Sequence, residues 1–294
     1  MIKHETYLRL RRILILLYTA LFTLTLIGCG VGRPAPTRDP HEGMVEVPNG
    51  AGGNMWVPLL TGVPISDFER TSFRREGDLI SFTDENYIVQ RGIDVSHFQE
   101  DIDWETVRAG GIEFAMIRCG YRGYSVGVIN EDPKFHENAA AALDAGLEIG
   151  IYFFSQAVTV SEARKEADFV LKMIRDYNVT LPVAFDWERI GAGETARTDD
   201  IGGAQLTDFA LAFCSEVRRA GYTPAVYFYR SLGYLEYELE RMGDLTFWVG
   251  AAGEYPDFYY EHEIWQYSFT GRVAGINTDV DLNLRFLERN TPAE

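Results

Sequence analysis

The sequence contains little cysteine and few basic residues, and it has only one long hydrophobic run. Cysteine accounts for 3 of its 294 residues, and the spacing of the cysteines does not indicate a metal site. Lysine and arginine number 27, against 44 aspartates and glutamates. Because contacts to nucleic-acid phosphates need clustered cations, this balance argues against nucleic-acid binding. The 46% hydrophobic and 24% charged residues indicate an ordinary folded chain and not a disordered one.

The one long hydrophobic run, "ILILLYTALFTLTLI" at residues 13–27, follows a basic start and is shorter than the roughly 20 residues that a membrane-spanning helix needs. This combination is typical of a secretory signal. The run ends in "LIGC", and Cys29 resembles the lipidated cysteine of bacterial lipoproteins. We therefore predict a signal peptide over residues 1–28 and an anchor in the membrane through a lipid on Cys29, with the protein outside the cytoplasm and facing the cell wall. An uncleaved signal anchor is the alternative.

Removal of residues 1–28 would leave 23 basic residues, 43 acidic residues and, besides Cys29, two cysteines. In an exported protein, Cys119 and Cys214 could form a disulfide. Cys119 falls in an apolar strand-like run and Cys214 in a helical one, so two buried free thiols fit the sequence at least as well.

Composition divides the rest of the chain into three parts. Residues 29–54 are rich in glycine, proline and charge, which predicts a flexible linker. Residues 55–89 gain apolar content without a clear period, and we expect them to form an N-terminal extension packed on the main domain. Residues 90–290 alternate strand-like and helical segments and should form that domain.

Eight short β-like runs lie at residues 91–96, 114–120, 148–155, 181–188, 223–230, 245–251, 263–268 and 279–286. Helical segments such as residues 161–178 separate the first five, which predicts parallel strands with helical crossovers. The apolar stripe of this helix consists of Ala163, Ala167, Val170, Leu171 and Ile174. The last three runs follow one another with little room for a helix. The pattern predicts an α/β fold, a barrel of eight strands whose final part has lost its helices.

Four carboxylates fall where the strands of such a barrel form its active mouth. Asp94 ends the first run, Asp186 and Glu188 end the fourth, and Asp281 lies in the eighth. Because residues two apart in a strand face the same side, Asp186 and Glu188 point together. In a closed barrel the first and eighth strands are neighbours, which places Asp94 beside Asp281. We expect four carboxylates around one opening.

Such clustering is costly, because burial and nearby like charges raise carboxylate pKa values. Glycoside hydrolysis nevertheless requires clustered carboxyl groups, since one carboxylic acid must donate a proton while an ionised group supports the cationic centre. Taken singly, each acid has another interpretation: a helix cap for Asp94, a turn residue for Asp186, a solvated acid for Glu188 and a barrel-closing hydrogen bonder for Asp281. Their joint position at strand ends favours the catalytic interpretation.

Several motifs are similar to those of a known family. They are "RGIDVSHFQEDIDW" (91–104), "FAMIRCGYRG" (114–123), "LPVAFDWE" (181–188), "YTPAVYFYR" (222–230), "WQYS" (265–268) and "DVDLN" (279–283). In this order they resemble the family 25 glycoside hydrolases, the Chalaropsis-type lysozymes, over about residues 90–288. The resemblance implies an irregular TIM-like (β/α)5(β)3 barrel without a metal or organic cofactor. It also implies an N-acetylmuramidase that cuts the β-1,4 bond between N-acetylmuramic acid and N-acetylglucosamine in peptidoglycan.

The same resemblance implies roles for the four acids. Glu188 would be the general acid, and Asp186 would stabilise the substrate's 2-acetamido group or the cationic centre directly. Asp94 and Asp281 would orient the acetamido group or tune Glu188.

Aromatic residues near strand ends are candidates for stacking on sugar rings. Tyr152, Tyr227 and Trp265 have a polar tip that favours a wet rim, so we expect them to contact substrate, together with Asn283 of the "DLN" motif. For Phe154 we expect packing in the core instead.

Two positions depart from the family's pattern. Phe153 stands where many members have a histidine, and "WVGAAG" at residues 248–253 lacks a ring unless Tyr255 replaces it. Both changes concern the sugar cleft and leave the carboxylates intact.

Two further classes of function stay open. One is a barrel that binds peptidoglycan without cutting it, against which the intact acid set argues. The other is a chitinase-like glycosidase of the family 18 type, but the longer acidic string of that family is absent, since Ala184 stands two residues before Asp186.

Overall fold

The computed structural model describes residues 39–191 and 193–289. The chain divides into residues 1–42, of which only the turn at residues 39–42 is described, and a compact unit that begins at Gly43. The predicted signal peptide, residues 1–28, and the predicted lipidation site Cys29 lie outside the described residues. Within the described part, no helix is both long and apolar enough to cross a membrane.

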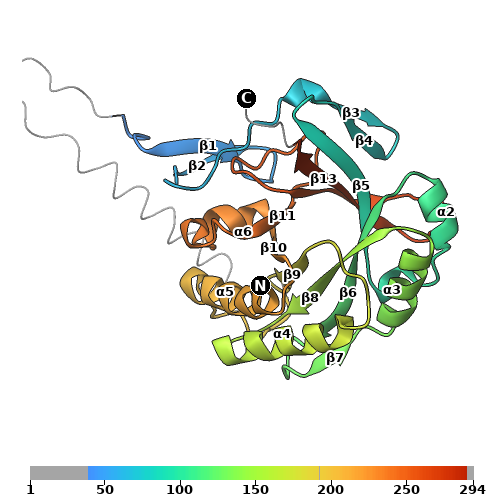
Figure 1. Ribbon diagram of the computed structural model, residues 1–294. Helices are drawn as coiled ribbons and strands as arrows, with labels where there is room; N and C mark the ends of the chain where they lie inside the picture. The colour runs from blue at the N-terminus through green and yellow to red at the C-terminus, as the bar shows by residue number, and fades with distance from the viewer. Residues whose placement is uncertain (1–38, 192, 290–294) are drawn as a thin grey trace, which may run out of the picture. The chain divides into compact units, whose positions relative to one another are not determined.

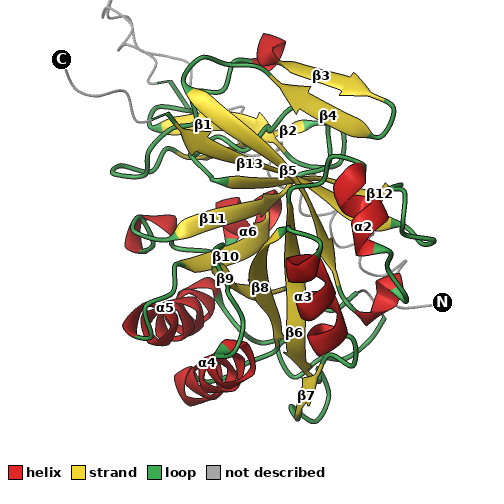
Figure 2. Ribbon diagram, turned by 45° about the vertical axis from the view of Figure 1, so that its right-hand side comes forward, coloured by secondary structure: helices red, strands yellow, loops and turns green. Residues whose placement is uncertain are grey.

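The compact unit is built around a closed barrel of eight strands (Figures 1 and 2). In chain order these are β5 (Tyr87–Val95), β6 (Phe114–Arg122), β8 (Glu148–Ser155), β9 (Val183–Trp187), β10 (Pro224–Tyr229), β11 (Thr246–Gly250), β12 (Ile264–Gly271) and β13 (Val280–Glu288). Neighbours from β5 to β12 pair in parallel, whereas β13 runs antiparallel between β12 and β5 and closes the ring. The short strand β7 (Ile129–Glu131) pairs with β6. The irregular TIM-like barrel predicted from the sequence is confirmed.

Helices follow the first five barrel strands and lie outside the barrel (Figure 2). They are α2 (Trp104–Ala109), α3 (Phe135–Asp144), α4 (Val160–Ile174), α5 (Gly203–Arg219) and α6 (Arg230–Leu235), with 3-10 turns η1 (Arg70–Ser72), η2 (His97–Gln99) and η3 (Leu239–Arg241). The side chain of Thr159 accepts a hydrogen bond from the backbone amide of Glu162 and caps α4. Four of the five residues in the predicted stripe of α4 are buried, and Leu171 is half-buried. The described residues between β11 and β13 contain no helix, as predicted.

The barrel is filled with apolar side chains below its mouth. A buried cluster there consists of Phe114, Met116, Tyr152, Leu181, Ala184, Ala225, Tyr227, Trp248 and Ile264. Gly92 leaves room for one of these rings, because a Cβ atom at this position would lie 2.2 Å from the ring of Phe114. On β9, Phe185 faces outward, with its ring centroid 5.4 Å from that of Phe213 in α5. Asp186 therefore faces inward, above an apolar filling that keeps water away from it.

Two antiparallel hairpins precede the barrel. The first pairs β1 (Met44–Pro48) with β2 (Asn54–Pro58), and the second pairs β3 (Phe73–Glu76) with β4 (Leu79–Phe82). Phe68, Phe73 and Phe82 pack on Phe286 of β13, with ring centroids 4.2, 6.1 and 5.3 Å away respectively. This aromatic cluster joins the N-terminal extension to the barrel.

The first hairpin corrects the predicted boundary of the linker. Residues 44–54, assigned above to a flexible linker over residues 29–54, form β1, a turn and the start of β2. The side-chain oxygen of Asn49 holds the turn by accepting hydrogen bonds from the backbone amides of Ala51 and Gly53, at 2.8 and 3.1 Å. Two of its glycines adopt positive φ angles, so residues that suggested flexibility supply the conformation that this turn needs.

The two cysteines of the compact unit do not form a disulfide. Cys119 in β6 and Cys214 in α5 are both free and buried. Burial raises the pKa of both thiols, so they stay protonated at neutral pH. Of the two alternatives left by the sequence, the free thiols are correct.

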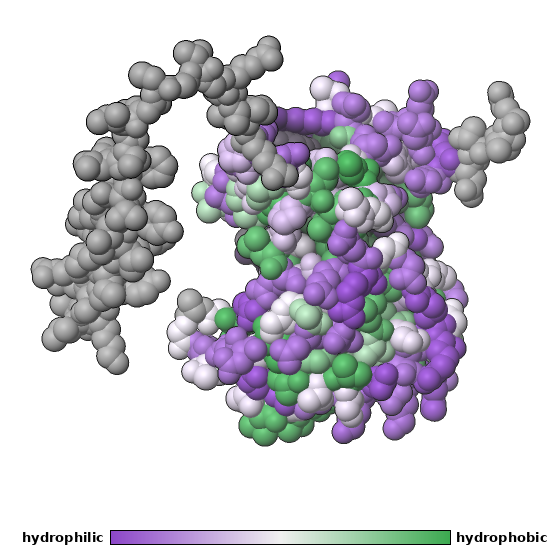
Figure 3. Space-filling view, turned by 90° about the vertical axis from the view of Figure 1, so that its left-hand side faces the viewer, coloured by the Kyte–Doolittle hydropathy of each residue, from purple (hydrophilic) through white to green (hydrophobic). Residues whose placement is uncertain are grey.

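Hydrophobic patches lie among hydrophilic residues on the face drawn in Figure 3. Large apolar side chains that are well exposed include Trp56, Phe98, Leu235 and Phe269. Single exposed apolar residues are common on protein surfaces. Phe98 and Phe269, however, line the same cavity at the barrel mouth, where aromatic faces can serve binding.

Candidate active site

A cavity of about 230 Å³ opens at the C-terminal ends of the parallel barrel strands. The four acids predicted from the sequence all line it: Asp94, Asp186, Glu188 and Asp281. Asp94 of β5 and Asp281 of β13 are direct cross-strand partners, because the barrel closes through these two strands. Asp186 comes from the inward face of β9, and Glu188 follows directly after that strand.

Asp94 and Asp281 share a hydrogen bond but differ in surroundings. Asp94 Oδ2 accepts hydrogen bonds from Gln266 Nε2 and Asn283 Nδ2, both at 2.8 Å. Burial nevertheless outweighs these donors and raises the pKa of Asp94 to about 6. Burial and the charge of Asp94 raise the pKa of Asp281 to about 9. At neutral pH Asp281 therefore holds a proton that it donates to Asp94.

The pKa values of Asp186 and Glu188 are also raised. Burial, followed by the charge of Asp94, raises the pKa of Glu188 to about 7, although a hydrogen bond from Tyr229 opposes the shift. Burial and the charge of Glu188 raise the pKa of Asp186 well above its usual range, and Arg118 opposes this. Asp186 Oδ1 is buried and has no hydrogen-bond partner among the described residues. The pair therefore offers a carboxylic acid that titrates near neutral pH beside a buried acceptor that lacks a donor.

Arg118 supplies the positive charge in this cavity. Its Nε donates to Asp132 Oδ2 at 2.8 Å, and its Nη2 lies 2.7 Å from His97 Nδ1. The guanidinium also stacks over the ring of Phe98, 5.2 Å from the centroid. These contacts fix the cation at the side of the mouth. Among the described residues, no group of three or more histidines, cysteines, aspartates or glutamates is placed to hold a metal ion.

The predicted sugar-contacting residues divide into two groups. Tyr152 and Tyr227 line the cavity, but as its floor and not as a wet rim, since their exposed fractions are only 9% and 4%. The hydroxyl of Tyr227 donates to Gln266 Oε1 at 2.6 Å.

Trp265 and Asn283 do not reach the cavity, and the predictions for them are wrong. Trp265 is fully buried outside the barrel wall, where its Nε1 donates to the carbonyl oxygen of Ala251 at 2.8 Å. The alternation of β12 turns its neighbour Gln266 inward in its place. Asn283 is fully buried below the mouth, accepts a hydrogen bond from Trp248 Nε1 at 2.8 Å and donates to Asp94. It positions a carboxylate and has no surface for substrate.

The expectation for Phe154 also fails, and the replacement considered for Tyr255 is not found. Phe154, assigned above to the core, is half-buried and lines the cavity, whereas Phe153 takes the outward core position and packs on Phe169. Tyr255 does not replace a missing ring in the mouth, because it lies under the guanidinium of Arg70 at 4.3 Å. The ring of Trp248, at the start of "WVGAAG", does line the cavity.

Sequence reasoning missed Arg118, Gln266 and Tyr229, which all line the cavity. A signal existed for the first two. Arg118 is the one charged residue in the apolar run "FAMIRCG", and an arginine inside a barrel strand needs a reason because burying its charge is costly. Gln266 interrupts the apolar run "IWQY" in the same way.

Comparison with known proteins gives consistent matches. Residues 93–276 match the family model described as "Glycosyl hydrolases family 25". Lysozyme M1 of Streptomyces globisporus is 30% identical over 207 residues, which cover 66% of this chain and 66% of that protein. The autolytic lysozyme of Clostridium acetobutylicum is 24% identical over 194 residues, 66% of this chain and 55% of its own length. The chain thus matches less than two thirds of the length of both relatives.

Among solved structures, a bacterial lysozyme from Streptomyces coelicolor is 28% identical with a TM-score of 0.55, over 69% of this chain and 93% of that chain. The modular autolysin LytC of Streptococcus pneumoniae has a TM-score of 0.59 at 21% identity, over 84% of this chain and 57% of that chain. At that identity the second match supports the fold alone.

Proposed function

Since the chain belongs to family 25 of the glycosyl hydrolases, we propose that it is a lysozyme-type N-acetylmuramidase. Its substrate would be peptidoglycan. It would cut the β-1,4 bond between N-acetylmuramic acid and N-acetylglucosamine. The observation that carries this proposal is the cavity at the barrel mouth, where four carboxyl groups with raised pKa values face one opening. Glycoside hydrolysis needs such a set, because one group must give a proton while another stays charged.

Glu188 is the proton donor in this proposal. Its pKa of about 7 leaves a large protonated fraction near neutral pH, which suits a general acid. The proton on its carboxyl group would pass to the glycosidic oxygen as the bond to the anomeric carbon breaks. The hydroxyl of Tyr229 hydrogen-bonds to this carboxyl and would hold it toward the bond.

Asp186 stabilises the positive charge that develops on the sugar. The N–H of a 2-acetamido group could donate to Asp186 Oδ1, the buried acceptor without a partner. Such a donor favours the ionised carboxylate, as does the charge of Arg118. Substrate binding would thus lower the pKa of Asp186 and direct the remaining proton of the pair to Glu188.

Asp94 and Asp281 set the charge of the site. Asp94 is one of the causes that raise the pKa of Glu188, and its ionised form is held by two amide donors. The proton on Asp281 reduces the repulsion within the group of four. We assign these two acids to tuning Glu188 and not to proton transfer.

The substrate polymer extends beyond the mouth along a neighbouring cavity. A cavity of about 390 Å³ shares Tyr229 and Phe269 with the catalytic one and reaches the turn of the first hairpin at Asn49, Gly50 and Ala51. This hairpin lies outside the residues that match the family model. We assign the second cavity to the next sugar of the glycan strand, so that the N-terminal extension takes part in binding.

The place of action follows from the substrate. An N-terminal lipid on Cys29 would hold the protein on the membrane, outside the cytoplasm, within reach of the cell wall. The hairpin begins at Met44, so the 14 residues between it and Cys29, residues 30–43, would serve as the tether.

Digestion of purified peptidoglycan tests the proposal. The chain that begins after Cys29 is incubated with the wall polymer, and the fragments are analysed by mass spectrometry. N-acetylmuramic acid at the new reducing ends supports the muramidase. N-acetylglucosamine there would indicate a glucosaminidase or chitinase-like specificity, and binding without cleavage would indicate a non-catalytic barrel. Glu188→Gln should abolish cleavage while Glu85→Gln, an exposed control, should not.

A further inference from the structure

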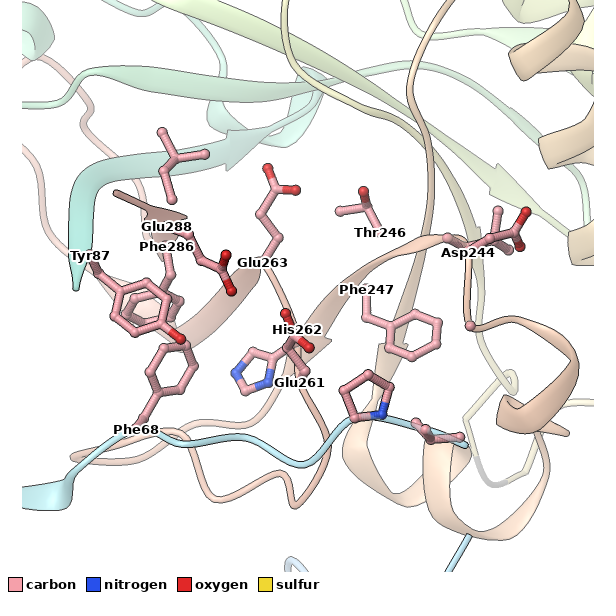
Figure 4. Close-up of a pocket in the computed structure, with 15 residues that line it drawn as sticks. Phe68, Tyr87, Asp244, Thr246, Phe247, Glu261, His262, Glu263, Phe286 and Glu288 are labelled. Atoms are coloured by element: carbon pink, nitrogen blue, oxygen red, sulfur yellow. The ribbon is translucent and has the colours of Figure 1, made fainter. Parts of the chain in front are cut away.

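A third cavity, separate from the two at the barrel mouth, lies at the opposite end of the barrel from the carboxylate cluster. It has a volume of about 420 Å³ and is shown in Figure 4. One wall is the segment Val63–Phe68 of the N-terminal extension. The others are the start of β11, the end of β13 and the loop that leads into β12. This cavity shares no lining residue with the catalytic cavity.

A buried histidine in this cavity lacks a hydrogen-bond donor. His262 lines the cavity, is 4% exposed and projects toward Phe68 (Figure 4). Its Nδ1 lies 2.9 Å from the carbonyl oxygen of Tyr260, which can only accept, so the ring proton is on Nδ1. Nε2 is then a bare acceptor, and it has no partner among the described residues. Burial lowers the pKa of His262 to about 4, so the ring is neutral in ordinary conditions.

The rim of the cavity is acidic, and two of its carboxylates lack a countercharge among the described residues. Glu263 pairs with Arg285 at 2.6 Å, but Glu261 and Glu288 form no ion pair among the described residues. None of the described residues that line the cavity is a lysine or an arginine. Burial, followed by the charge of Glu288, raises the pKa of Glu261, as expected for two carboxylates that lie near each other.

The cavity walls between His262 and the two glutamates are aromatic. The rings of Phe68 and Phe286 lie 4.2 Å apart between centroids, and Tyr87 packs 5.2 Å from Phe68. The hydroxyl of Tyr87 already donates to Asp67 at 2.7 Å, so it is not free to serve Nε2 of His262. Apolar faces beside carboxylates suit an alkyl chain that ends in a cation.

We propose that this cavity binds a primary alkylammonium group, with its N–H donors directed to His262 and to the carboxylates of Glu261 and Glu288, and its alkyl chain against Phe68 and Phe286. An ammonium group has three donors and no acceptor, which matches a site composed of one neutral acceptor and two anions. An anion would meet repulsion. A neutral apolar ligand would leave Nε2 unpaired, at a cost comparable to a lost hydrogen bond.

Two sources can supply such a group. One is the side-chain amine of a diamino acid in a cell-wall peptide, and the other is a free diamine. The peptide would make the cavity a second contact with the wall polymer, at the end of the barrel away from the cut bond.

Calorimetric titration of the chain that begins after Cys29 tests the inference. The probes are cadaverine and Nα-acetyl-lysine methylamide, and the matched control is the same lysine derivative acetylated on its side-chain nitrogen. We expect both amines to bind and the acetylated control not to bind. Preference for the lysine derivative over cadaverine would identify a peptide as the source; equal binding would identify the ammonium group alone as the determinant.

Variants separate this site from the catalytic one. Glu261→Gln together with Glu288→Gln should weaken amine binding about tenfold or more, because each change replaces a charged acceptor by a neutral one and so weakens its hydrogen bond to the ammonium group. His262→Phe should act in the same direction, and His262→Gln, which restores an acceptor, should recover part of the binding. The control Glu105→Gln should bind as the parent does. Equal binding by all variants, or by the acetylated probe, would overturn the inference. Peptidoglycan cleavage by the parent chain is measured in parallel. Its absence would refute the catalytic proposal and leave the amine-binding result unaffected.

Discussion

Replacing Glu188 by glutamine is expected to stabilise the fold at alkaline pH while it removes the activity. In the folded protein the pKa of Glu188 is raised from 4.5 to about 7 by burial and by the charge of Asp94. An acid with a raised pKa makes the folded state less stable as the pH increases, because the unfolded chain loses its proton first. The cost starts near pH 4.5 and is fully present above pH 7.

The magnitude follows from the size of the shift. Each pKa unit corresponds to about 1.4 kcal/mol, so the carboxylate costs up to about 3 kcal/mol above pH 7. Glutamine has nearly the same shape, carries no charge, and its carbonyl oxygen can still accept the hydrogen bond from Tyr229. Glu188→Gln should therefore match the parent protein at pH 4 and exceed its free energy of unfolding at pH 8 by up to about 3 kcal/mol.

Urea unfolding of both proteins at pH 4 and pH 8, followed by tryptophan fluorescence, measures the difference. Peptidoglycan cleavage by the same samples should fall by about two to four orders of magnitude, the usual contribution of a general acid. The exposed residue Glu85 provides a control, because Glu85→Gln should change neither quantity. A stability difference that is the same at both pH values would refute the raised pKa, and a variant that retains most of its rate would refute the role of Glu188 as acid.

Three other results are expected. Gln266→Met removes one of the two amide donors that favour the ionised form of Asp94, so the pKa of Asp94 should rise above about 6 and the acid limb of the pH–rate profile should move to higher pH; an unchanged limb would exclude Asp94 from control of the rate. Ala51→Trp narrows the cavity beside the hairpin turn, so cleavage of long glycan strands should slow several-fold while the shortest cleavable fragment is unaffected; equal slowing of both would contradict the binding role of the hairpin. In the chain that begins after Cys29, a thiol reagent should label neither Cys119 nor Cys214 in the native state and both in urea, because both are buried and free; rapid native labelling would contradict their burial.

The order of the barrel could be read from the sequence because it depends on local patterns. Each of the eight β-like runs corresponds to a strand, and β8 has the predicted bounds of residues 148–155. The stripe on α4 faces the barrel because the period of a helix fixes one apolar side. The i, i+2 rule likewise turned Asp186 toward the barrel interior.

Errors arose where the face of a residue depends on its neighbours in space. Apolar residues flank both Trp265 and Gln266, so the sequence of β12 does not show which of them faces inward. The pairing of β12 with β13 also shifts register after Gln266, which breaks simple alternation. The hairpin at residues 44–58 was missed because glycine is compatible both with a flexible linker and with a turn of positive φ.

The sequence by itself determined which acids stand at strand ends, that the strands alternate with helices, and that cations are too few for nucleic-acid binding. The tertiary structure decided how those acids behave. Closure of the barrel pairs Asp94 with Asp281, although the two are far apart in the chain. The apolar filling beneath them keeps water out. Burial, and the charge of Asp94 acting through a medium that screens little, therefore bring the pKa of Glu188 near 7. Desolvation and proximity are properties of the packed barrel, and no local stretch of the chain contains them.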